Sequence, residues 1–252
     1  MEVGISGARV LYTVPIDIPI LGPIVITETM VVSWLVVLII TGVCIWLTRD
    51  LKVENISKKQ AAAEYLVNMA NNFVVGNMGE KFRYLVPFVA ALFASSLVSN
   101  LIGLLGLRSP TADLNTEVAW ALVVFALITA QKIKAGGFLG YLKGYTQPIA
   151  ILTPFNVLSE LATPIGMSFR HFGNILSGVV INALIYAALT LASSALFGIL
   201  PGVLGEVLSQ IPVLAVGVPA ITSVYFDWVS GVLQAFIFCM LTVMYIANAD
   251  EG

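Results

Sequence analysis

The chain has 252 residues, of which 59% are hydrophobic and only 10% are charged, and its formal net charge is −2. Soluble domains carry about 25% charged residues, so this composition excludes an ordinary soluble domain and indicates a membrane protein. The small net charge argues against a nucleic-acid partner, and two cysteines in apolar runs, Cys44 and Cys239, do not resemble a disulfide framework.

The first half of the chain predicts an external segment followed by helices. Residues 1–29 lack the basic and apolar regions of a cleaved signal peptide and form an external N-terminal segment. Residues 30–48 carry no charge and are long enough to cross a hydrocarbon core of about 30 Å. Residues 58–80 place apolar side chains on one helical face, which predicts an amphipathic helix on the membrane surface. Residues 84–107 and 117–133 are the next two predicted spans.

The second half predicts a long tilted hairpin of two helices. Residues 150–200 would span about 65 Å or more as one helix, roughly twice the bilayer core, and Pro164 predicts a bend within it. Pro201–Gly202 is the strongest turn signal that follows. Residues 203–220 are either a loop or a broken first part of the last helix, which covers residues 221–248.

These elements predict an all-α integral membrane protein with one membrane domain over residues 1–252. It has about five membrane-embedded helices and one amphipathic surface helix. If the five spans alternate, only Arg9 and Arg108 fall on one side, and the excess of basic residues on the other side marks the cytoplasm. This places the N-terminus outside and the C-terminus in the cytoplasm. The basic residues on the cytoplasmic side are Arg49, Lys52, Lys58, Lys59, Lys81, Arg83, Lys132, Lys134 and Lys143.

Arg170 is the most informative single residue, because it lies in an apolar stretch and no other Lys or Arg follows Lys143. A cation at the centre of a spanning helix costs about 3 kcal/mol on insertion scales. Such a residue is retained where it faces a partner or a water-filled path. The structural alternative is an arginine that snorkels or pairs with an acid, although no acid lies within one helical turn of it.

Four further polar residues lie in the same two predicted helices. Asn174 is four residues after Arg170 and shares its face. Glu160 lies about 15 Å before Arg170 along a straight helix, so it is a protonatable group at a different depth or a carboxylate at the membrane edge. Asp227 and Gln234 share a face of the last helix, and such an Asp marks an ion route or pairs with a cation.

Asp113, Asn115 and Glu117 surround the predicted external end of the third span. They form either a polar access funnel or a set of acids that cap a helix N-terminus. His171 can titrate near neutrality. With no second histidine to build a metal cluster, a structural histidine with polar partners is the favoured interpretation.

This pattern favours ion movement over enzymatic chemistry. The sequence has no Ser/His/Asp set, no two-histidine zinc motif and no phosphate-binding glycine loop. We therefore predict no catalytic residue, no metal ligand and no cofactor. The buried polar residues alone leave a stand-alone ion channel or a secondary transporter as the alternative.

Three segments, in the same order, resemble the a subunit of F-type ATP synthases. Phe-Arg-His-Phe-Gly-Asn-Ile at residues 169–175 is similar to the family's Arg-Leu-Phe-Gly-Asn signature. Leu-Gln-Ala-Phe-Ile-Phe at residues 233–238 is similar to its last-helix motif, and Pro-Thr-Ala-Asp-Leu-Asn at residues 110–115 resembles its Pro-Ser-Ala-Asp-Val-Asn loop. The resemblance covers most of the chain.

The resemblance implies an ion-translocating stator subunit of a rotary ATP synthase, with no ATP chemistry on this chain. Two long tilted helices would wrap a ring of c subunits and form two offset half-channels. On this match Arg170 is the essential arginine between them, with Asn174 and Gln234 beside it. Asp227 stands in the entry half-channel, and Glu160 lies near polar or acidic positions of relatives.

The same resemblance implies the partners and the compartment. The partners are the c-subunit ring, b-type peripheral stalk subunits, the rest of the ATP synthase and the lipid bilayer, in a bacterial cell membrane. The coupling ion, H⁺ or Na⁺, is not specified by this chain, because the carboxylate that binds it lies on another subunit.

Two departures from the family pattern stand close to Arg170. His171 stands where leucine is usual, and Val179 stands where many relatives have glutamate. We hypothesise that Asp227 takes over the function of that missing carboxylate.

Overall fold

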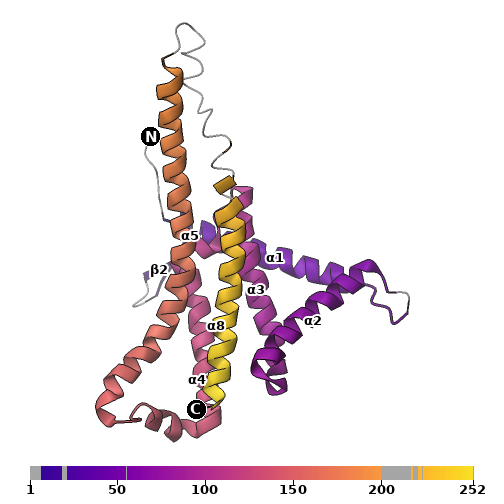
Figure 1. Cartoon of the computed structure of the whole chain (residues 1–252), viewed down its shortest axis with the longest axis vertical. Helices are drawn as coiled ribbons and strands as arrows, with labels where there is room; N and C mark the ends of the chain where they lie inside the picture. Colours follow the sequence, from indigo (N-terminus) through magenta and orange to yellow (C-terminus); the bar gives the residue numbers. More distant parts are fainter. Residues whose placement is uncertain are drawn as a thin grey trace.

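The computed structural model describes residues 7–18, 22–54, 56–199, 217, 221–222 and 224–251 (Figure 1). The predicted turn at Pro201–Gly202 and nearly all of residues 203–220 lie outside these residues. Within the described part of the chain, five helical segments are long and apolar enough to cross a membrane, which confirms the predicted all-α membrane architecture. They are Glu28–Thr48, Glu80–Leu105, Leu114–Gly144, Ala150–Phe197 and Trp228–Asp250.

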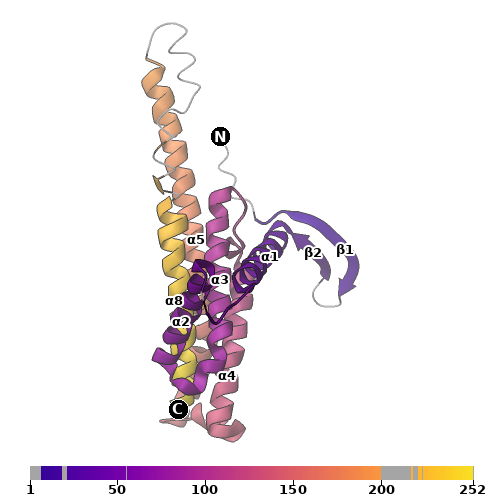
Figure 2. The same cartoon turned by 90° about the vertical axis from the view of Figure 1, so that its right-hand side faces the viewer.

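A β-hairpin that the sequence did not predict precedes the helices. Strands β1 (Val10–Ile18) and β2 (Gly22–Thr27) pair antiparallel, and the hairpin projects away from the helices (Figure 2). The pairing is irregular between Thr13 and Asp17, on either side of Pro15. Proline has no N–H to donate to a partner strand, which agrees with the irregular pairing around Pro15.

Helices α1 (Glu28–Thr48) and α2 (Lys58–Met78) form a V that points away from the rest of the molecule (Figure 1). Each begins at a hydroxyl N-cap, Thr27 for α1 and Ser57 for α2, which accepts a hydrogen bond from a backbone N–H of the first turn. Only the end of α2 is held in the core, where Val74 and Met78 are buried. The rest of α2 is largely exposed, and its place on the membrane surface stays a prediction.

The next two spans are α3 and α4. Helix α3 (Val86–Leu101) follows the 3-10 helix η1 (Glu80–Leu85), and α4 (Leu114–Gly144) follows η3 (Pro110–Ala112) with Asp113 as its N-cap. Helix α4 extends beyond the expected 117–133. Its regular part ends at Gly137, whose φ of 71° and ψ of 164° are accessible to glycine at little cost. The lysines and glycines near residue 134 therefore mark a kink and not the end of the helix.

Helix α5 (Thr153–Phe197) has 45 residues, contains Pro164 and is about 68 Å long, roughly twice the bilayer core. The chain returns through the π-helical segment η6 (Val224–Ser230) and α8 (Gly231–Glu251). Helices α5 and α8 lie side by side in both views and run in opposite directions (Figures 1 and 2). Only 6% of the most apolar window of α5 is buried, so most of this helix faces outward.

The core lies between α3, α4 and α8, with contributions from the end of α2, from η1 and from one residue of α5. Helices in a membrane associate by close packing and polar contacts, because lipid is as apolar as their own side chains. The core therefore fixes α8 at the centre and leaves α5 against its side. Buried members of the core are Val74, Met78, Phe82, Leu85, Val89, Leu92, Ala121, Val124, Ile128, Met167, Phe238, Cys239, Val243, Ile246 and Ala249.

Candidate functional site

Arg170 lies on the exposed face of α5. Its guanidinium has no hydrogen bond or ion pair to any residue that the structure describes. It borders a small cavity of about 200 Å³, lined also by Gly166, Met167, Leu241 and Tyr245. An unpaired cation of this kind is available to a group from outside the chain.

A hydrogen bond sets the register between α5 and the last helical segment. The Asn174 Nδ2 atom donates to Ser230 Oγ at 2.6 Å. Arg170 lies four residues before Asn174, and Gln234 lies four residues after Ser230. In an antiparallel pair these spacings bring Arg170 and Gln234 to the same level. The small cavity, lined by Thr163 together with Leu241, agrees with this register.

A larger cavity of about 450 Å³ opens between α4, α5 and the end of α8. It shares three lining residues, Ser159, Thr163 and Tyr245, with the small cavity beside Arg170. Its charged lining residues are Lys132 and Glu160. The two cavities therefore share a wall, the larger one beside the kinked end of α4 and the smaller one at the level of Arg170.

Glu160 is paired within the larger cavity. Its Oε1 atom lies 3.0 Å from Lys132 Nζ and accepts a hydrogen bond from the Tyr141 hydroxyl at 3.3 Å. Burial, followed by the nearby Glu160, raises the pKa of the Tyr145 hydroxyl above its usual value, so Tyr145 stays protonated. Because Tyr141 donates to Glu160, its oxygen accepts from Tyr145. Glu160 is thus a carboxylate held by one cation and a pair of phenols.

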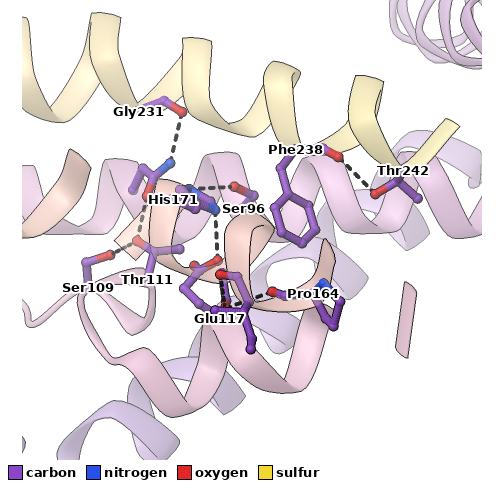
Figure 3. A network of polar contacts seen from close by, with 12 residues as sticks. Ser96, Ser109, Thr111, Glu117, Pro164, His171, Gly231, Phe238 and Thr242 are labelled. Atoms are coloured by element: carbon purple, nitrogen blue, oxygen red, sulfur yellow. Dashed lines mark hydrogen bonds and ion pairs between the residues drawn. The ribbon is translucent and has the colours of Figure 1, made fainter. Parts of the chain in front are cut away.

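The opposite end of α4 carries a second polar group. Asp113 caps the helix by accepting from the Asn115 backbone N–H, and its Oδ2 accepts from Thr29 Oγ1 of α1 at 2.8 Å. Asp113 therefore acts as a helix N-cap, which is one of the two roles predicted for it. Asn115 is exposed. Asn100 links this end to α8 by donating to the Gly231 carbonyl oxygen at 3.0 Å (Figure 3).

Glu117 and His171 form a buried pair that joins α4 to α5 (Figure 3). Glu117 Oε2 lies 2.9 Å from His171 Nδ1, and the two side chains are 0% and 1% exposed. Neither Glu117 oxygen makes a well-aligned hydrogen bond, so the proximity of the two groups defines the pair. The other ring nitrogen of His171 lies 3.4 Å from Ser96 Oγ of α3. His171 thus has the polar partners that a structural histidine requires.

Asp227 lies in the π-helical segment η6, and its side chain is outside the described part of the structure. A π-helical turn contains more residues than an α-helical turn. The spacing of seven residues between Asp227 and Gln234 therefore no longer defines one face in the way that it would in a regular α-helix.

Sequence reasoning missed the partners of the acids. Lys132 and Tyr141 of α4 hold Glu160, and His171 holds Glu117, across 19 to 54 positions of the chain. Ser230, the partner of Asn174, was not singled out. The sequence shows that these polar residues lie in apolar helices, but it does not show which helices are neighbours.

Comparison with known proteins gives a consistent result. A family model described as "ATP synthase A chain" matches residues 30–247. The chain is 29% identical over 276 residues to "ATP synthase subunit a, sodium ion specific" of Propionigenium modestum, covering 97% of this chain and 86% of that protein. It is 33% identical to "ATP synthase subunit a 1" of Hahella chejuensis, covering 92% and 87%. It is 30% identical to "ATP synthase subunit a" of Moorella thermoacetica, covering 94% and 97%.

Proposed function

Since the chain belongs to the ATP synthase A chain family, as the ion-translocating stator subunit of an F-type ATP synthase, we propose that Arg170 separates two ion half-channels within it. The observation that carries this proposal is the unpaired guanidinium of Arg170 on the outward face of α5, beside a polar cavity. The family places the chain in the ATP synthase complex and in the membrane as a multi-pass protein.

The chemistry of arginine supports this role. A guanidinium stays charged at any working pH, whereas a lysine ammonium can lose its proton when it is buried. In a site with little water, Arg170 attracts a carboxylate that arrives without its ion and repels a cation that would cross directly, because Coulomb energies rise as the dielectric falls. Asn174, one turn further along α5, and Gln234, on the facing helix α8, complete the proposed site beside Arg170.

We assign one half-channel to the cavity that contains Glu160 and Lys132 and place it on the cytoplasmic side. Lys81, Lys132 and Lys143 belong to the basic end of the molecule, and an excess of basic residues marks the cytoplasmic side. This orientation puts the C-terminus in the cytoplasm and the N-terminus outside. In this half-channel Glu160 holds a negative charge near the ion path, and Lys132 compensates it.

We place the other half-channel between the external end of α4 and the beginning of the last helix. Asp113 and Asn115 supply a polar entrance, and the inner part runs past η6, which contains Asp227, toward Gln234. Glu117 was expected beside this entrance. Because its side chain is buried and paired with His171, we assign it a different role below.

The proposed partners follow from the surfaces that the chain leaves exposed. The outward face of α5 carries Arg170, so we place the c-subunit ring and its ion-binding carboxylates against this face. The b-type peripheral stalk subunits fit the apolar faces that α1 and α2 leave uncovered on the other side of the molecule (Figure 1). The proposed compartment is a bacterial cell membrane.

Replacement of Arg170 tests the proposed role. We expect Arg170→Ala to abolish ion-driven ATP synthesis in membrane vesicles while the chain remains inserted, because the barrier and the attraction for the carboxylate are both lost. Arg83→Ala is the matched control, since Arg83 is exposed and pairs only with Glu80 of its own turn. Synthesis at the wild-type rate in Arg170→Ala would overturn the proposal.

A further inference from the structure

We propose that the buried Glu117–His171 pair is a positioning device that sets the register and the rotation of α5, and thereby the place of Arg170. This inference rests on the proposed function of Arg170. It assigns to Glu117 and His171 the role of positioning residues that act through Arg170 and touch no ion themselves.

His171 fixes the rotation of α5 because three other helices surround it. Its ring lies 2.9 Å from Glu117 of α4, 3.4 Å from Ser96 of α3 and 5.8 Å, between ring centroids, from Phe238 of α8. Successive side chains of an α-helix point about 100° apart. When His171 is turned into the bundle, the side chain immediately before it, Arg170, is therefore turned to the outside.

Apart from the half-buried Asn174, which donates to Ser230, the contact surface of α5 near Arg170 determines its register poorly. Between Pro164 and Gly178, the buried residues of α5 other than His171 are either small or unbranched, or they hydrogen-bond only within α5. They are Pro164, Met167, Ser168 and Gly178. Ser168 bonds only to carbonyl oxygens of its own helix. A slip of one turn along such a stripe exchanges one small residue for another and moves Arg170 by about 5.4 Å. Only the Glu117–His171 contact is specific for one register among these buried positions.

A polar pair is the appropriate device for this task. A well-packed apolar pair often stabilises a structure as well as a buried ion pair does, and buried polar groups are best attested as determinants of register. Neither Glu117 nor His171 lines the two cavities described above, and both side chains are almost fully buried. This location favours positioning over proton transfer.

Two substitutions of Glu117 separate positioning from proton transfer. Glu117→Gln keeps the length of the side chain but removes its acidity, whereas Glu117→Asp keeps the acid but withdraws it from His171 by one methylene. Register is measured by the yield of the disulfide between Asn174→Cys and Ser230→Cys in assembled membranes, in a background with Cys44→Ser and Cys239→Ala. The pair Ser177→Cys and Ser230→Cys reports a slip by one turn.

We expect Glu117→Gln to keep the yield of the 174–230 cross-link. In the chain without the reporter cysteines, Glu117→Gln should keep ATP synthesis within twofold of the parent. We expect Glu117→Asp to lower the 174–230 cross-link yield and the rate of ATP synthesis at least threefold each. The yield of the 177–230 cross-link should rise. Thr242→Val is the matched control, because Thr242 is buried and bonds only within α8, and it should change neither yield.

The proposal would be overturned if Glu117→Asp preserved ATP synthesis and Glu117→Gln abolished it while the cross-link yields stayed unchanged. That result would indicate proton transfer by Glu117. Equal cross-link yields in both variants would overturn it as well. The cross-links do not depend on the charge of Arg170. Wild-type synthesis in Arg170→Ala would therefore refute the proposed function of Arg170 without affecting the measurement of register.

Discussion

At the scale of single residues, Glu117 and Glu160 have partners inside this chain, whereas Arg170 has none among the residues that the structure describes. Glu160 is held by Lys132 and Tyr141, and Glu117 is held by His171. A buried charge that loses its partner is costly, so removing one member of either pair should be unfavourable. The exposed guanidinium of Arg170 agrees with the proposal that its counter-charge is a carboxylate of another subunit.

The pair of Glu160 and Lys132 should behave as one unit. We expect Glu160→Gln and Lys132→Gln each to lower ion-driven ATP synthesis about threefold, in the range of a partly exposed ion pair. The double variant should be no worse than the more affected single variant, because residues in direct contact are not additive. Rates in vesicles at one fixed driving force measure this. Strictly multiplicative losses would contradict the coupling, and Glu80→Gln, in an exposed pair, serves as the control.

Arg170, Asn174 and Gln234 could be selected from the sequence because an isolated charge and its helical spacing are local properties. The partners of the acids could not be selected in this way. The contact of Glu117 with His171 depends on which face α4 turns to α5, and this is decided by the packing of four helices. The interpretation of Asp113 as a helix cap was among the alternatives, and its bond to the Asn115 N–H agrees with it.

At the scale of helices, close approach is concentrated where α8 begins. A Cβ atom on Gly231 would lie 2.9 Å from the Cβ of Asn100, whose side chain also donates to the Gly231 carbonyl oxygen. Asn100 is further held by Thr111, so it has little room to move. Gly231 therefore permits the close approach of α3 to α8.

Gly231→Ala should therefore destabilise the chain by about 1–3 kcal/mol through overpacking, which exceeds the gain of helix propensity that alanine normally brings. The measurement is thermal inactivation of the detergent-solubilised complex. Gly42→Ala in α1 is the control, since a Cβ atom there meets nothing within 4 Å. Equal thermal stability of the two variants would show that α3 and α8 adjust without cost.

The sequence predicted the existence of the helices better than their irregularities. Uncharged runs of sufficient length identified the spans because the bilayer imposes a length. The kink at Gly137, the π-helical segment η6 and the β-hairpin were not predicted. Each of them depends on backbone geometry or pairing that hydropathy does not report.

At the scale of the whole molecule, the basic end is tied together through Asp250. Its carboxylate accepts from Gln131 of α4 at 2.6 Å and pairs with Lys81 of η1. Residues from three separate elements thus converge near the end of α8. This contact keeps the cavity around Glu160 bordered by α8, whose residues Tyr245 and Asn248 line it.

Asp250→Asn removes the charge but keeps the size of this side chain. We expect a loss of about 1 kcal/mol, because Lys81 is largely exposed and its contribution is screened. Thermal inactivation of the complex, compared with Glu80→Gln at a fully surface-exposed pair, measures the difference. A variant as stable as this control would mean that the Gln131 hydrogen bond alone holds the end of α8.

The outward face of α5 has a consequence for how the chain tolerates sequence change. Because only 6% of its most apolar window is buried, substitutions on this face remove few contacts within the chain itself. In a saturation mutagenesis scan, substitutions at exposed positions such as Leu184 and Leu191 should leave the amount of the chain in the membrane unchanged. They should slow growth under conditions in which growth depends on ATP synthesis. Core positions such as Val124 should be costly in both selections. If substitutions on the outward face of α5 and in the core had the same effects in both selections, the outward face would be constrained by the folding of the chain itself and not by a partner.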